Sequence, residues 1–329
     1  MAKYSLRVSE GFIKLAMFCN RFNFSGSSKK YCIPFVVNGQ QVGLVRPDVA
    51  GYLRDFPEVF LMEPNGVTGE VEKVELSQSL TTFTERTNKV EEVLQKLREK
   101  DAFLTLEGWR NETYDVKSRF AEPALLKMER SATCLFGVVQ YGVHINGYTY
   151  QRGEGLRMWL GKRSATKPTF PGKLDQMVAG GLASGLSVMQ CAYKECQEEA
   201  SVPDELLKKL KPVGCMSYFY EDERGLFPEM QFVMDLEVPG DFTPVNADGE
   251  TESFQLVSVA ELKQLIISDG FKFNSALCVL DFLMRHGQIL PDEGLTLTIL
   301  LLLLGLTTPV TLKEKLYSNF KVLLCLVFL

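Results

Sequence analysis

Histidine is nearly absent from this sequence, since the 329 residues include only His144 and His286. The eight cysteines are scattered, and no two of them form a Cys-x-x-Cys pair. A zinc site built from cysteine and histidine is therefore not expected, and a chain this long does not need a disulfide framework. Buried, reduced thiols are the interpretation that remains, and they suit a cytoplasmic protein.

Basic residues are not in excess either. The chain has 36 Lys and Arg against 41 Asp and Glu, which gives a formal net charge of -5. Duplex DNA or RNA attracts surfaces with an excess of positive charge, so no nucleic-acid partner is expected. The apolar fraction of 46% suits a globular protein with a sizeable core.

Long uncharged runs are also rare, and the exception is the C-terminus. Residues 295–312 carry no charge, a length that approaches the ~20 residues of a membrane-spanning helix. The run contains Gly305 and Pro309 and is followed by Lys313. We interpret residues 295–329 as an atypical hydrophobic tail; a marginal membrane anchor and an unusual tail both stay open, and membrane contact is expected only here.

The first thirty residues contain several Lys and Arg and a single acid, Glu10. This composition resembles an organelle transit peptide, but the apolar run of a secretory signal is missing. The apolar pattern continues into IPFVVNGQQVGLVRP without a break that resembles a cleavage site. We expect a cytoplasmic location, with a mitochondrion or plastid as the alternative.

Residues 1–125 have the pattern of a small α+β domain. Asn38-Gly39 predicts a two-residue hairpin, and a second strand pair is expected around LEGWRNETYDV. Between them, a helix is predicted over residues 84–100, with a capping box formed by Thr82 and Glu85. Its apolar stripe consists of Val90, Val93, Leu94 and Leu97.

Residues 126–294 alternate between strand and helix patterns. Asn146-Gly147 predicts a hairpin between two strands, and further strands are expected near residues 212–220, 229–239 and 252–259. Helices are predicted over residues 188–200, in DELLKKL, and over 259–267 and 274–286. This order predicts a mixed α/β sandwich of about 160 residues.

The helix predicted over residues 188–200 carries three glutamates within five residues, Glu195, Glu198 and Glu199. The loop before it contains Gly180 and Gly181. At about 100° per residue, the three carboxylates project from one face of the helix. A solvated acidic face is the ordinary explanation, but a glycine loop that leads into such a helix also suits hydrated Mg²⁺ held against a phosphate chain.

The stretch from Gly180 to Val202 resembles the Nudix box, G-x5-E-x7-R-E-U-x-E-E-x-G-U, where U is aliphatic. The register places Glu195, Glu198 and Glu199 on the three metal-binding glutamates of that family. The departures are Leu186 for the early Glu, Lys194 for the Arg and Ser201 for the last Gly. Lys194 keeps the positive charge but not the fork of arginine, which affects rate and metal stoichiometry more than reaction class.

The resemblance continues outside the box, in IPFVVNGQQVGLVRP, MWLGKRSATKPTFPGKLDQM and DGETESFQLVSV. Over residues 15–292 the chain is similar to the Nudix branch related to thiamine pyrophosphokinase, which includes plant chloroplast members. This similarity implies an α/β/α Nudix sandwich behind a smaller N-terminal α+β domain. It also implies conversion of thiamine diphosphate, or its damaged oxo and oxy analogues, to the monophosphate with Mg²⁺, or alternatively Mn²⁺.

Two other functions stay open. Homologues of this branch are linked to oxidised nucleoside diphosphates, which makes 8-oxo-dGDP the alternative small-molecule substrate. A non-catalytic Nudix module that senses a ligand is an alternative of another class. The three retained glutamates argue against it, because binding alone would not require them. Nothing in the sequence indicates the oligomeric state.

The resemblance also suggests roles for single residues. Mg²⁺ is expected on Glu195, Glu198 and Glu199, and Lys194 is expected to orient these carboxylates. Glu250, or alternatively Glu252, is the candidate for a general base or an extra metal ligand.

Candidate substrate-binding residues precede the box. Lys162 and Arg163 are expected to bind phosphate oxygens, and Trp159 and Phe170 are expected to stack on a heteroaromatic ring. The candidates that border the substrate are Gly180, Gly181, Lys173 and Asp175. For the two aromatic side chains, a place in the core is the ordinary alternative.

Overall fold

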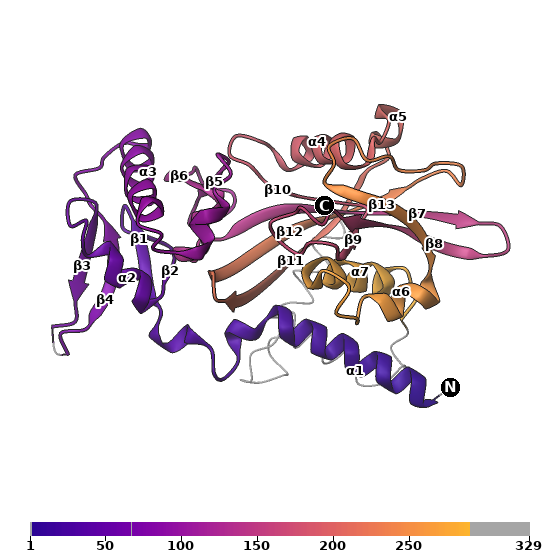
Figure 1. Ribbon diagram of the computed structural model, residues 1–329, viewed down its shortest axis with the longest axis horizontal. Coiled ribbons are helices and arrows are strands. Elements are labelled where there is room, and N and C mark those ends of the chain that lie inside the picture. The colour runs from indigo at the N-terminus through magenta and orange to yellow at the C-terminus, as the bar shows by residue number, and fades with distance from the viewer. Residues whose placement is uncertain (1, 67, 290–329) are drawn as a thin grey trace.

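The computed structural model describes residues 2–66 and 68–289 (Figure 1). The tail predicted over residues 295–329 lies outside this part of the chain. None of the helices within residues 2–66 and 68–289 is long and apolar enough to cross a membrane.

The N-terminal body, residues 33–138, is built on a four-stranded sheet with the order β2-β1-β4-β3. Its strands are β1 (Ile33–Val37), β2 (Gln40–Val45), β3 (Phe60–Pro64) and β4 (Val71–Leu76). The hairpin predicted at Asn38-Gly39 is confirmed, because both residues have positive φ angles, 50° and 72°, as the right-handed twist of a two-residue turn requires. Helix α2 (Pro47–Leu53) follows β2.

Helix α3 (Phe83–Glu99) confirms the helix predicted over residues 84–100. Thr82 and Glu85 form the predicted capping box at its start. The four apolar side chains of the stripe are all buried, and they pack into the core of the N-terminal body. The short helix η3 (Leu104–Gly108) and the strand pair β5 (Thr113–Val116) and β6 (Leu126–Glu129) follow. A second strand pair is therefore present, but only β5 lies in LEGWRNETYDV, and its partner β6 comes after residue 125.

The large body is organised around a seven-stranded sheet with the order β11-β12-β7-β8-β13, in which β10 pairs with β7 and β9 with β8. Its strands are β7 (Gln140–Gln151), β8 (Gly155–Arg163), β9 (Leu174–Gln176), β10 (Val178–Gly181), β11 (Lys211–Asp222), β12 (Gly225–Glu237) and β13 (Thr251–Ser258). Strands β12 and β7 pair in parallel, and the other pairs of this sheet are antiparallel.

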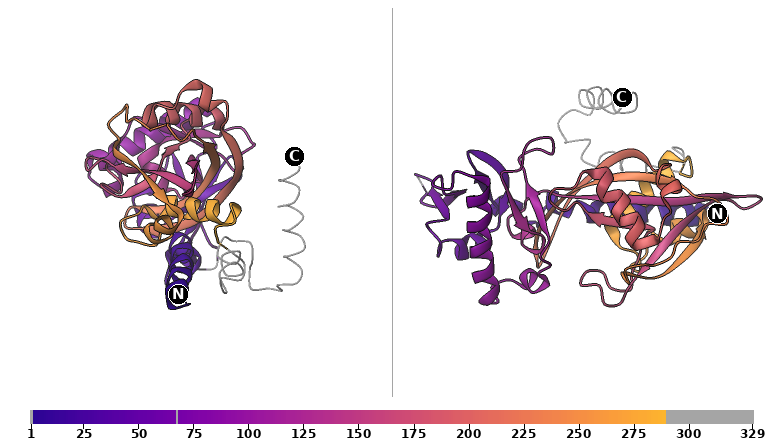
Figure 2. Two further views of the ribbon diagram at one scale, coloured as in Figure 1. Left: turned by 90° about the vertical axis from the view of Figure 1, so that its right-hand side faces the viewer. Right: turned by 90° about the horizontal axis from the view of Figure 1, so that it is seen from above.

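Helices cover both faces of the large sheet. Helices α4 (Val188–Ala200) and α5 (Asp204–Leu207) lie on one face, and α6 (Val259–Leu265) and α7 (Phe273–Arg285) lie on the other (Figure 1). The predicted α/β/α sandwich with a separate α+β body is therefore confirmed. The two bodies lie side by side along the longest axis of the molecule (Figure 2).

The hairpin predicted at Asn146-Gly147 is wrong. Strand β7 runs straight through this pair, and the chain turns instead at residues 152–154, where Gly153 has a φ of 84°. Tertiary contacts override the local turn signal. The Asn146 side chain is buried and donates to Asp235 Oδ1 at 3.0 Å, and a Cβ on residue 147 would stand 2.2 Å from the Met177 sulfur.

Helix α1 (Ala2–Cys19) packs into the large body, although it comes first in the chain. Its buried side chains Val8, Phe12 and Cys19 share one hydrophobic cluster with residues of α7. Conversely, Leu126 and Leu135 belong to the core of the N-terminal body. The domain boundaries predicted from the sequence, 1–125, 126–294 and 295–329, therefore stay a prediction.

The seven cysteines within the described residues are free thiols, and most of them are buried as expected; Cys32 is half-buried and Cys215 is exposed. Both histidines are held by polar neighbours, His144 by the Gln176 amide and His286 by Asp235 at 3.1 Å. Burial, with a further effect from Lys272, lowers the pKa of His144 to about 4.

Candidate active site

Helix α4 and the loop before it hold the residues of the Nudix-like motif. The helix begins after Ser187, whose hydroxyl accepts from the Gln190 backbone N–H. The Gln190 side chain in turn accepts from the Ser187 backbone N–H, which completes a capping box. One side of the helix is apolar and buried, with Cys191, Ala192 and Cys196 packed against the sheet. This packing fixes the rotation of the helix and thereby the direction of its carboxylates.

Two of the three glutamates lie against successive residues of β10. Glu199 is buried, and its Oε2 accepts from the Ala179 backbone N–H at 3.0 Å. The carboxyl carbon of Glu195 stands 2.2 Å from the point that a Cβ on residue 180 would occupy. Gly180 is therefore required for this close approach of α4 to the strand.

The third glutamate, Glu198, forms an ion pair with Lys194. The ammonium group of Lys194 lies 2.7 Å from Glu198 Oε2 and 3.4 Å from Glu195 Oε1. One positive charge thus stands between two carboxylates of the motif. Glu198 is half-exposed, whereas the Glu195 side chain retains only 15% of its accessible surface.

Burial makes the ionised forms of the inner glutamates costly. It raises the pKa of Glu199 to about 7, against the opposing effect of the Ala179 N–H donor. Burial also raises the pKa of Glu195, although Lys194 and Arg130 act in the other direction. Positive charge brought to this face of α4 would stabilise both carboxylates.

The three motif glutamates are the donor set that a divalent ion would use. Within residues 2–66 and 68–289, no group of three or more His, Cys, Asp or Glu side chains is assembled closely enough to hold a metal. Each motif glutamate instead has its own neighbour: Glu199 contacts Ala179, Glu195 contacts Gly180, and Glu198 contacts Lys194. Their chemistry still fits, because carboxylate oxygens are the ligands of Mg²⁺ and an ammonium already lies between two of them.

Lys167 is a residue that the sequence analysis missed. Its side chain is largely buried and forms an ion pair with Glu250. Burial, followed by the repulsion of Arg163 and Lys272, lowers the pKa of Lys167 to about 8, while Glu199 acts in the other direction. The loop SATKPTF has no pattern that could have identified it. The other candidate acid, Glu252, pairs with Lys162 at 3.0 Å.

Arg163 is not free to bind a phosphate. Its guanidinium donates to Asp175 Oδ2 at 2.9 Å and to the backbone carbonyl oxygens of Thr169 and Phe170. Lys272 also reaches Asp175, at 3.0 Å. Arg163 and Asp175 therefore form a buried structural pair under the loop 164–173. Lys162 and Lys173 keep more accessible side chains.

The two aromatic candidates are packed against apolar neighbours. Trp159 is buried in the core beneath α4, and its indole N–H has no acceptor among the described residues. Phe170 packs edge to face on Phe273, with ring centroids 5.4 Å apart. The ordinary alternative, a place in the core, describes the packing of Trp159, whereas Phe170 is half-buried.

The N-terminal body reaches the motif from the other side of β10. A Cβ on Gly181 would stand 1.8 Å from the Tyr114 hydroxyl oxygen and 3.2 Å from the guanidinium carbon of Arg130. Arg130 in turn pairs with Glu112 at 2.7 Å. Sequence reasoning missed these residues, because no local pattern connects β5 with a loop about seventy residues later.

Comparisons with known proteins agree with this arrangement. The family model described as NUDIX domain matches residues 142–274, and the model described as domain of unknown function (DUF4743) matches residues 11–140. The first match covers β7 through the start of α7 and includes all three motif glutamates. The second covers the second half of α1 and the N-terminal body.

Two plant proteins of Arabidopsis thaliana are similar over most of the chain. Nudix hydrolase 20, chloroplastic, is 39% identical over 300 residues, which cover 89% of this chain and 77% of the relative. Nudix hydrolase 24, chloroplastic, is 39% identical over 285 residues, which cover 86% and 74%. The chain therefore belongs to the Nudix hydrolases, enzymes that act on diphosphates.

Proposed function

We propose that the enzyme converts thiamine diphosphate, or its oxo and oxy analogues, to the monophosphate and inorganic phosphate. The observation that carries the proposal is the position of the Lys194 ammonium between Glu198 and Glu195, the latter of which lies against Gly180. Assignment to the branch related to thiamine pyrophosphokinase rests on the sequence motifs outside the box, and it is part of the same proposal.

Glu195, Glu198 and Glu199 would hold Mg²⁺, with Mn²⁺ as the alternative ion. When bound, a divalent ion neutralises phosphate charge and acidifies water. Lys194 keeps Glu195 and Glu198 turned toward each other, and the Ala179 N–H fixes Glu199. These contacts reduce the rearrangement that the carboxylates need before they act together.

The loops at the edge of the site supply the remaining groups. Glu250, which pairs with Lys167, is proposed to accept the proton of the attacking water. Lys162 and Lys167 bring positive charge to the phosphate oxygens, while Arg163 holds the loop in place. We assign the phosphate role to these lysines, since the guanidinium of Arg163 is already used.

The test is a Mg²⁺-dependent turnover comparison of thiamine diphosphate, its oxy analogue and 8-oxo-dGDP. A site that forms hydrogen bonds to a ring oxygen rejects a ring without it far better than a site that only stacks. We therefore expect the highest kcat/KM for the oxygen-substituted thiamine diphosphate. A much higher value for 8-oxo-dGDP would replace this substrate with the oxidised nucleotide, and no turnover of any of the three would refute the proposal.

For the location, the names of the two plant relatives favour the plastid alternative. They give no support to the cytoplasmic expectation, so we propose a plastid location. Import of the labelled protein into isolated chloroplasts tests it, and labelled protein that stays outside would contradict it.

A further inference from the structure

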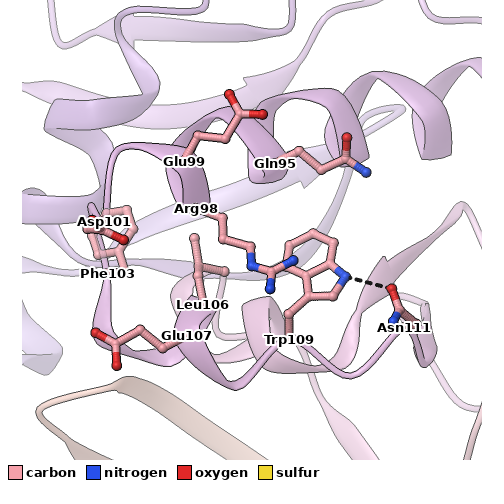
Figure 3. Close-up of a pocket in the computed structure, with 9 residues that line it drawn as sticks. All are labelled: Gln95, Arg98, Glu99, Asp101, Phe103, Leu106, Glu107, Trp109 and Asn111. Atoms are coloured by element: carbon pink, nitrogen blue, oxygen red, sulfur yellow. Dashed lines mark hydrogen bonds between the residues drawn. The ribbon is translucent and has the colours of Figure 1, made fainter.

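Two cavities are candidates for a further ligand. One, of about 510 Å³, lies wholly in the N-terminal body, where Arg98 covers the ring of Trp109 and the indole N–H donates to Asn111 (Figure 3). None of its lining residues belongs to helix α4. The other, of about 360 Å³, lies between the two bodies and is lined by residues of both.

The interbody cavity borders the loop that leads into α4. Its wall on the large body includes Tyr141, Leu182 and Leu186, and its wall on the N-terminal body includes Tyr114 and Phe120. Its volume falls in the range of about 300–1,000 Å³ that is usual for small-molecule sites. Apolar and aromatic side chains form most of its surface.

The N-terminal body fixes this loop in position. The Ser184 backbone N–H donates to the Thr113 carbonyl at 2.8 Å, and the Ser184 hydroxyl donates to Asp115 at 2.5 Å. The Tyr114 hydroxyl also fills the space that Gly181 leaves open. Strand β5 thus holds the loop, and with it one wall of the cavity, in a defined place.

The cavity wall begins two residues along the chain from the glycine that the Glu195 carboxylate contacts. Along β10, Ala179 contacts Glu199, Gly180 contacts Glu195 and Gly181 contacts Tyr114, and Leu182 then begins the cavity wall. Adjacent residues of a strand are about 3.3 Å apart. Residues 180 and 182 face the same side of the strand, about 7 Å apart. A group attached to phosphates at Glu195 is therefore within reach of Leu182, which lines the cavity.

Aromatic rings and one cation define what this cavity accepts. Phe120 lies 5.0 Å from Tyr141 between ring centroids, at an interplanar angle of 58°, and it is 38% exposed. The Lys117 ammonium stands 5.6 Å from the centroid of the Phe120 ring, within reach of Asp115 at 3.4 Å. Such walls suit a flat ring with polar edges.

We propose that the cavity between the two bodies binds the heteroaromatic ring of the diphosphate substrate, with Phe120 and Tyr141 as its main contacts. The N-terminal body is then a specificity element of the active site. The identity of the ring rests on the proposed function. The position of its binding site rests on the contacts given above.

Binding measurements separate the ring from the phosphates. Oxythiamine and 8-oxo-deoxyguanosine probe the ring without a phosphate chain, and inorganic pyrophosphate with Mg²⁺ probes the glutamates without a ring. We expect Phe120→Ala to weaken binding of the better ring compound at least about fivefold and to leave pyrophosphate binding unchanged. Glu198→Gln should weaken pyrophosphate binding and leave binding of the ring compound unchanged.

Two further variants complete the test. Leu186→Trp fills the cavity and should also weaken ring binding, so one misfolded variant does not decide the outcome. Trp109→Ala, in the other cavity, is the matched control and should bind like the parent. Equal ring binding by the parent, Phe120→Ala and Leu186→Trp overturns the inference. A parent whose Kd exceeds about 1 mM for both ring compounds overturns it as well. Absence of diphosphate turnover alone refutes only the proposed function.

Discussion

Glu195 and Gly180 are in contact only because residue 180 has no side chain: the Glu195 carboxyl carbon lies 2.2 Å from the position of a Cβ there. The glycine that begins the motif therefore does more than allow a turn. It lets a carboxylate of α4 lie directly on the backbone of β10, in line with Glu199 on Ala179. Addition of a single methyl group tests this contact.

We predict that Gly180→Ala displaces the Glu195 carboxylate and lowers kcat/KM by about 10²-fold, the effect of a displacement of about 1 Å in a catalytic group. Phosphate release with Mg²⁺ measures it. Gly51→Ala is the matched control, since a Cβ there meets no atom within 4 Å. Parent-like turnover of Gly180→Ala would show that the position of Glu195 does not matter.

Glu198→Gln should lower kcat by about 10² to 10³-fold and leave the melting temperature close to that of the parent. The side chain is half-exposed, so its carboxylate contributes to the site more than to the fold. Glu205→Gln is the control, because Glu205 also pairs with a lysine but lies on α5. If Glu198→Gln and Glu199→Gln both hydrolyse the best substrate like the parent, the metal role of these glutamates is lost.

Ser201 ends α4 in the left-handed region, with φ 50° and ψ 41°, at the position where the Nudix box has glycine. A side chain costs about 1 kcal/mol in this conformation. Ser201→Gly should therefore raise the free energy of unfolding by about 1 kcal/mol, as measured by urea denaturation, with activity retained. Ser201→Ala keeps the Cβ and should bring no gain; an equal gain in both variants would place the cause outside the backbone.

The Arg163–Asp175 pair predicts a pH-dependent stability. Burial disfavours the Asp175 carboxylate, but Lys272 and Arg163 outweigh this effect and hold its pKa well below the ordinary value. The stability that the ionised Asp175 contributes is therefore fully present above the pKa that this group has in the unfolded chain. It is lost as the pH falls toward the lower pKa of Asp175 in the folded protein. At pH 7, Asp175→Asn should cost about 3–5 kcal/mol, because it leaves two buried cations without their partner.

Urea denaturation at several pH values measures this difference. The stability gap between parent and Asp175→Asn should narrow between about pH 5 and pH 2, since the parent then loses its charged pair as well. Asp241→Asn, an exposed change, serves as the control. A gap that stays constant over this range would contradict the linkage.

Local patterns predicted the parts of this fold that local forces decide. The stripe of α3, the turn at Asn38-Gly39 and the helix of the motif glutamates appear where expected, because each depends on residues a few positions apart. Asn146-Gly147 failed because its partner Met177 lies thirty residues away, and contact with Met177 requires a glycine within a strand.

The candidate site divides in the same way. The glutamates and Gly180 follow from the spacing in one segment. Arg163, in contrast, could be judged only once Asp175 and the carbonyl of Thr169 stood beside it. Tyr114 reaches Gly181 from another body of the protein, and such a contact has no signal in a single sequence.

The packing of α1 also sets an order for biosynthesis. The thiol of Cys19 donates to the carbonyl of Phe273, 254 residues later, and Phe12 shares its cluster with α7. At a synthesis rate of roughly 5–20 residues per second, roughly 10–50 s pass between the synthesis of this helix and that of its partner residues on α7. Contacts of α1 with β11 involve residues made earlier, but the face of α1 that packs on α7 stays exposed to chaperones until α7 has been made, so this early helix completes its packing late.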